Sequence, residues 1–127
     1  MTNDEVIDTL KQLIEQLEKR ITELNSLRND RSIPFNQRPI RQNQIIQRTS
    51  SLNLRILQLE QQLHDRELVR SLNHSVPALT DSRKESLQKA LEVVSTDISN
   101  TRTFQAAITL ASKMSEAASK AGDATKL

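Results

Sequence analysis

Residues 7–24 read IDTLKQLIEQLEKRITEL, and this stretch decides the fold class. It follows a heptad repeat in which isoleucine holds the a positions and leucine holds the d positions: Ile7, Ile14, Ile21, Leu10, Leu17 and Leu24. Such spacing lays one narrow apolar stripe along a helix, and that stripe must be buried against another helix. Val6, Leu13 and Leu27 widen the stripe. A widened stripe favours a helix packed in a bundle over a two-stranded zipper.

The composition leaves little room for β structure. The 127 residues include no tryptophan, no tyrosine, no cysteine and one glycine, so turns and aromatic cross-strand pairs are scarce. A chain of this length usually forms about one domain. We therefore expect an all-α fold, an antiparallel helical bundle with coiled-coil-like packing, in which residues 1–127 form a single helical domain.

Helix boundaries follow from caps, prolines and periodicity. We expect three long helices, at about 4–28, 44–72 and 82–121, with a proline-containing loop at 29–42. Pro34 and Pro39 predict the loop, because proline disfavours helix at itself and at the residue before it. The third helix contains a polar run at 99–103, where it either continues, as we expect, or divides into two helices.

The second expected helix has more apolar surface than one neighbouring helix can cover. Four of its leucines fall on a different face from its heptad positions: Leu54, Leu57, Leu68 and Leu72. We predict that these leucines bind a partner by helix-in-groove docking. The expected function is a non-enzymatic protein–protein interaction module, such as an adaptor, a regulator or a chaperone-like assembly subunit. The partner is another protein or a second copy of this chain in a homodimer.

Positive charge is concentrated in residues 28–55, which hold six arginines against one aspartate. Guanidinium groups bind phosphate and carboxylate in bidentate fashion. The candidates to contact an anion or an acidic partner are therefore Arg31, Arg38, Arg41 and Arg48. Binding of nucleic acid or of an anionic surface through this arginine-rich segment is the main alternative function. A second alternative is membrane-surface association through the Ala/Ser-rich C-terminal helix.

Motifs for catalysis and for cofactor binding are sparse. One glycine, Gly122, cannot build a phosphate-cradling loop or a dinucleotide fingerprint, and the lack of cysteine removes thiolate chemistry. Glu60, His64 and Glu67 have the i, i+4, i+7 spacing of one helix face, which we interpret as solvated rather than metal-binding. We expect no enzyme activity, no catalytic residues, no cofactor and no metal.

The first residues of the chain do not resemble a secretory signal. Asp4, Glu5 and Asp8 lie where a signal peptide carries basic residues and an apolar run. No apolar segment approaches the roughly 20 residues that cross a bilayer. We expect a cytoplasmic protein without a transmembrane segment, although export by a route that needs no signal is compatible with the sequence.

Overall fold

The computed structural model describes residues 1–29 and 33–127, and these residues form helices and connecting segments without any strand. The α-helices are α1 (Asn3–Ser26), α2 (Arg38–Ser71), α3 (Asp81–Val94) and α4 (Phe104–Ala124). Three short 3-10 helices lie in the connections: Leu27–Asn29, Phe35–Gln37 and Ile98–Asn100. The predicted all-α class is confirmed. The prediction of three long helices is wrong, because the described residues hold four.

The predicted third helix is divided at its polar run. At the end of α3, the Ser95 hydroxyl donates a hydrogen bond to the Leu91 carbonyl over 2.6 Å. Thr103 then caps the start of α4, where its side chain accepts from the Ala106 backbone N–H over 3.0 Å. Short polar side chains that bond to nearby backbone groups favour helix ends. One helix over 82–121 was therefore the wrong choice, and the alternative with two helices is correct.

The proline loop ends earlier than the predicted 29–42. Residues 30–32, which include the candidate Arg31, lie outside the described residues. Helix α2 begins at Arg38 and carries Pro39 in its first turn. Proline is tolerated there because the N–H groups of a first turn have no partner within the helix, so no hydrogen bond is lost. The predicted start near residue 44 is therefore too late.

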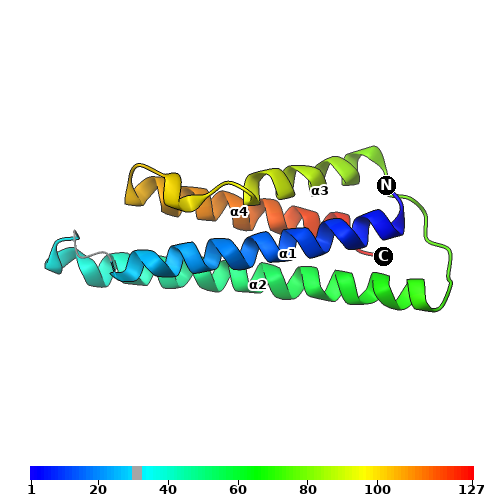
Figure 1. Cartoon of the computed structure of the whole chain (residues 1–127), viewed down its shortest axis with the longest axis horizontal. Coiled ribbons are helices and arrows are strands. Elements are labelled where there is room, and N and C mark those ends of the chain that lie inside the picture. The colour runs from blue at the N-terminus through cyan, green and yellow to red at the C-terminus, as the bar shows by residue number, and fades with distance from the viewer. Residues whose placement is uncertain (30–32) are drawn as a thin grey trace.

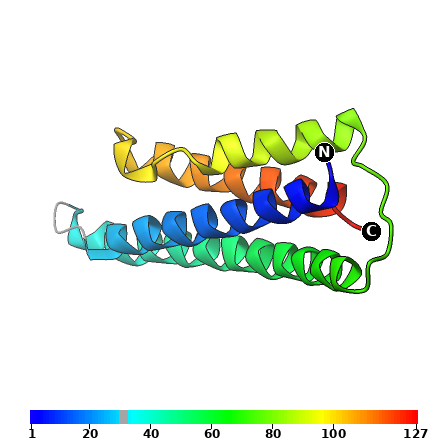
Figure 2. The ribbon, with the colours of Figure 1, turned by 45° about the vertical axis from the view of Figure 1, so that its right-hand side comes forward.

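The helices lie in two layers, α1 beside α2 and α3 beside α4 (Figure 1). Helix α1 packs on α2 and α3, and α4 packs on the same two helices. The chain runs toward the α1–α2 connection along α1 and away from it along α2. Both chain ends lie at the other end of the molecule, beside the long connection from α2 to α3 (Figure 2).

The core is built from the heptad stripe of α1 and from matching sides of the other helices. Leu17 and Leu24 are fully buried in one apolar cluster with Leu59 of α2. Helix α4 contributes mainly small side chains to this cluster: Ala107, Ala111, Ala118 and Ala121. Small residues let α4 approach its neighbours closely. A Cβ atom added at Gly122 would lie only 2.5 Å from Nε2 of Gln58 on α2.

Two buried arginines form hydrogen bonds that link the ends of helices to distant parts of the chain. Arg66 of α2 donates through Nε to the Thr125 carbonyl over 2.8 Å and through Nη1 to Asn3 Oδ1 over 2.9 Å. Arg20 of α1 donates through Nη1 to the Thr96 carbonyl, just beyond α3, over 2.7 Å. Burial lowers the pKa of Arg66, because it disfavours the charged guanidinium. The hydrogen bonds offset part of that cost.

Carboxylates at the helix ends have shifted pKa values. Hydrogen bonds from Thr2, in a capping box, lower the pKa of Glu5 below its ordinary value. Hydrogen bonds from Ser99 lower the pKa of Asp97 in the same way. Burial raises the pKa of Glu23, although its Oε2 accepts from the Ile98 backbone N–H over 2.8 Å. These three groups make the stability of the fold depend on pH.

Candidate interaction surfaces

Three of the four leucines predicted to bind a partner lie on the outer side of α2, and Leu72 follows directly at its C-terminal cap. Their exposed fractions are 56% for Leu54, 64% for Leu57, 49% for Leu68 and 55% for Leu72. At about 100° per residue they fall within an arc of about 60°, on the side of α2 away from the core. We call these four residues the α2 leucine face. Helix α2 packs on α1 and α4 through its other sides, so the described helices leave this face in solvent.

Acidic side chains flank the α2 leucine face. Glu60, Asp65 and Glu67 lie between its two leucine pairs along the helix. Asp65 Oδ1 accepts from Gln61 Nε2 over 3.0 Å, and Glu67 Oε1 lies 3.8 Å from Lys11 Nζ. The one arginine in this stretch, Arg66, points into the core. Between the two leucine pairs the exposed charge is therefore negative, while Arg55 and Arg70, next to the leucines in sequence, lie on other sides of the helix.

The arginine candidates do not converge on one site in the described residues. Arg38 donates through Nε to the Ile33 carbonyl over 3.1 Å, and its Cζ lies 5.7 Å from the centre of the Phe35 ring. Arg41 lies over the ring of Phe104, with Cζ 4.8 Å from the ring centre. Cation–π contacts of this kind hold both guanidinium groups near the start of α2. Arg48 lies further along α2 and lines a separate groove.

That separate groove lies between α2 and α4 and has a volume of about 390 Å³. We call it the polar groove, because every residue that lines it is polar or charged: Arg48, Ser51, Arg55, Ser112, Ser115, Glu116, Ser119 and Lys120. Of these residues, Arg48 alone was predicted from the sequence as an anion contact. A signal was present in the i, i+3, i+7 spacing of Arg48, Ser51 and Arg55, which places the three on one side of a helix.

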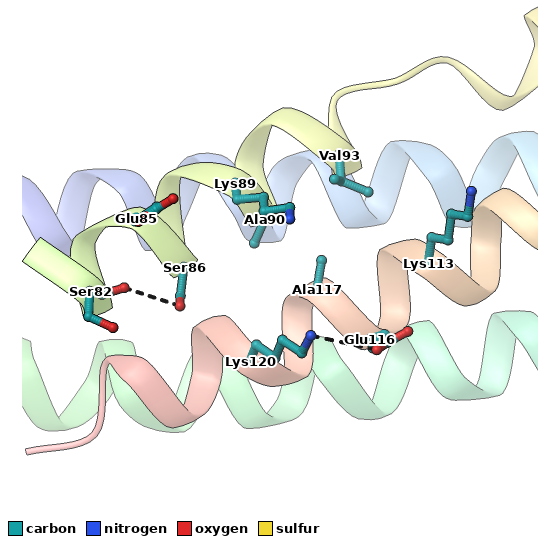
Figure 3. A pocket seen from close by; sticks show the side chains of 10 residues that line it. All are labelled: Ser82, Glu85, Ser86, Lys89, Ala90, Val93, Lys113, Glu116, Ala117 and Lys120. Carbon is teal, nitrogen blue, oxygen red and sulfur yellow. Dashed lines mark hydrogen bonds and ion pairs between the residues drawn. The ribbon is translucent and has the colours of Figure 1, made fainter.

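A second groove, of about 460 Å³, lies between α3 and α4 (Figure 3). Ala90 and Val93 of α3 and Ala117 of α4 form its apolar part. Lysines, glutamates and two serines line the rest, and Lys120 Nζ lies 3.6 Å from Glu116 Oε1. Figure 3 shows these charged side chains at the edges of the groove. Its charges nearly balance and its lining mixes polar with apolar groups, so this groove favours no particular class of ligand.

Within 1–29 and 33–127, no three His, Asp or Glu side chains come together in a way that could hold a metal ion. In the same residues no helix combines the length and apolar character that crossing a membrane requires. Comparisons with protein-family models, with curated proteins and with solved structures find no match to this chain.

Proposed function

We propose that this chain is a non-enzymatic interaction module that binds a partner helix on the α2 leucine face. The observation that carries the proposal is the position of four large apolar side chains on one side of α2, in solvent and away from the core. Burying a leucine side chain completely contributes about 1.5 to 3 kcal/mol. Covering four half-exposed leucines would therefore contribute several kcal/mol before the costs of association.

The chemistry of the surface indicates the kind of partner. From Leu54 to Leu72 the face spans about 27 Å, which matches an amphipathic helix of about 18 residues. Because Glu60, Asp65 and Glu67 flank the leucines, the matching helix carries lysine or arginine beside its apolar stripe. Arg38 and Arg41 lie about 20 Å or more beyond Leu54 along α2, so a partner helix of this length does not reach them.

We propose that residues 1–127 act as one helical domain. In that domain α1 and α2 pack in antiparallel, coiled-coil fashion along the heptad stripe, supported by the burial of Leu10, Leu17 and Leu24. A rigid hairpin of this kind presents the α2 leucine face with little conformational change on binding. An adaptor, a regulator or an assembly subunit in the cytoplasm would use such a preformed surface.

The test measures binding of a designed peptide by fluorescence anisotropy. The probe is a labelled amphipathic helix of about 18 residues with a leucine stripe flanked by lysines. We expect saturable binding, and we expect the variant Leu54→Gln/Leu57→Gln to bind at least tenfold more weakly while its circular dichroism spectrum stays helical. The matched control is Leu127→Gln, because Leu127 is an equally exposed leucine outside the face, at 57%.

Two results would contradict the proposal. Equal binding by the wild type and the double variant would show that the peptide does not use the leucines. A stable dimer in light scattering, of twice the 14.4 kDa chain mass and abolished by the double variant, would assign the face to self-association instead.

A further inference from the structure

We propose that the polar groove between α2 and α4 binds a phosphate group, carried either by inorganic phosphate or by a small phosphomonoester. The inference is independent of the proposed function. At about 100° per residue, Arg48, Ser51 and Arg55 lie on average about 120° around α2 from the centre of the α2 leucine face. A ligand in the groove and a helix on the leucine face would therefore occupy different sides of α2.

The first argument is an arginine side chain without a protein partner. Among the described residues, Arg48 makes no hydrogen bond and has no carboxylate within ion-pair distance. Its Nε–H is enclosed, so Arg48 meets a ligand in the groove through its terminal nitrogens. A phosphate oxygen is a strong acceptor for an arginine N–H.

The second argument is a set of hydroxyl donors that hydrogen bonds already hold in place in the groove. Arg55 donates through Nε to Ser115 Oγ over 3.2 Å, and the hydroxyls of Ser51 and Ser115 are hydrogen-bonded over 2.6 Å. That bond uses one of the two hydroxyl protons. The other hydroxyl proton remains available to a ligand. The terminal nitrogens of Arg55 are likewise available to a ligand, because its hydrogen bond to Ser115 uses Nε only.

The third argument is charge. Arg48, Arg55 and Lys120 bring three positive charges to the groove, and Glu116 brings one negative charge. Glu116 Oε1 lies 3.6 Å from Lys120 Nζ, so this acid is already paired with a cation. The net excess of two positive charges matches a phosphate group, which carries about −1.5 to −2 at neutral pH. Several N–H and O–H donors around an excess of positive charge are what a tetrahedral oxyanion requires.

The first experiment titrates the whole protein with inorganic phosphate in a calorimeter, at an ionic strength held constant with chloride. We expect saturable binding, and we expect Arg48→Gln to weaken it about tenfold or more, as for the loss of one charge-assisted hydrogen bond. The matched control is Arg102→Gln, which removes the same charge from an exposed position before α4. Its affinity for phosphate should equal that of the wild type.

Two further variants change exposed residues, so they test the groove even if Arg48→Gln fails to fold. Lys120→Gln should weaken phosphate binding, whereas Glu116→Gln should strengthen it several-fold because a like charge leaves the groove. A parallel titration with glycerol phosphate distinguishes a phosphomonoester ligand, which would bind more tightly, from inorganic phosphate. The inference is overturned by heats no larger than those of chloride, by equal losses in Arg48→Gln and Arg102→Gln, or by shifts of the same sign in the Lys120 and Glu116 variants.

Discussion

Replacing Leu57 and Leu59 by alanine, one at a time, compares the outer side of α2 with its core side. The two leucines are two residues apart on one helix, so the change in helix propensity is the same. Leu59 is fully buried, whereas Leu57 is 64% exposed. Removing a buried leucine side chain costs about 3 to 5 kcal/mol, because transfer free energy is lost and a cavity remains.

The cost of Leu57→Ala is much smaller. About a third of its side chain is covered, which corresponds to about 0.5 to 1 kcal/mol, and alanine recovers a small part of this through its higher helix propensity. Unfolding in urea, followed by far-ultraviolet circular dichroism, measures both variants. With a slope of about 2 kcal/mol per molar urea, the midpoint should fall by about 2 M for Leu59→Ala and by less than about 0.5 M for Leu57→Ala. Similar losses of stability in the two variants would refute the claim that Leu57 lies on a surface that contributes little to folding.

Three other predictions concern the helix ends, the α2–α4 contact and pH. Thr103→Ala removes the cap of α4 and should cost about 1 kcal/mol in thermal unfolding, whereas no loss would place the start of α4 elsewhere. Gly122→Leu should cost about 1 to 3 kcal/mol, because Gly122 is buried and the side chain of Gln58 must move aside; replacing Gln58 by alanine as well should remove part of this cost, and an equal loss in the double variant would contradict the close approach. Since the pKa values of Glu5 and Asp97 are lowered from 4.5 and 3.8, stability should fall as pH decreases below about 4.5, where the unfolded chain binds more protons. The fall should be measured in a Glu23→Gln background, because the raised pKa of Glu23 acts in the opposite sense, and it should be smaller when Glu5 and Asp97 are also replaced by amides.

The sequence predicts the helices better than their ends. The heptad stripe identifies α1, since periodicity depends only on local spacing and burial of one face. The first turn of α2 was missed because Pro39 was interpreted as a helix breaker, although proline fits a first turn. The division between α3 and α4 was weighed and not preferred, because the choice depends on which local side-chain bonds form, and Thr103 and Ser95 reveal this only through geometry.

The candidate sites were predictable only in part. Leu54 and Leu57 were selected from the pattern and prove to be exposed, while their role in binding stays a prediction. The buried position of Arg66 could not be foreseen, because its acceptor, the Thr125 carbonyl, is 59 residues away in sequence. The polar groove could not be predicted, because the sequence does not show which side of α4 faces Arg48. Periodicity gives the faces of each helix, but it does not say which faces meet.

Chemical-shift mapping by nuclear magnetic resonance tests the central claim most directly. Isotopically labelled protein would be titrated with the lysine-flanked amphipathic peptide, and the backbone amide shifts would be followed along the chain. The account predicts that the largest changes lie between Leu54 and Leu72 of α2, with little change in α3. Changes centred on α3 and α4, or no saturable change at all, would contradict the claim that the exposed leucines of α2 are a binding surface.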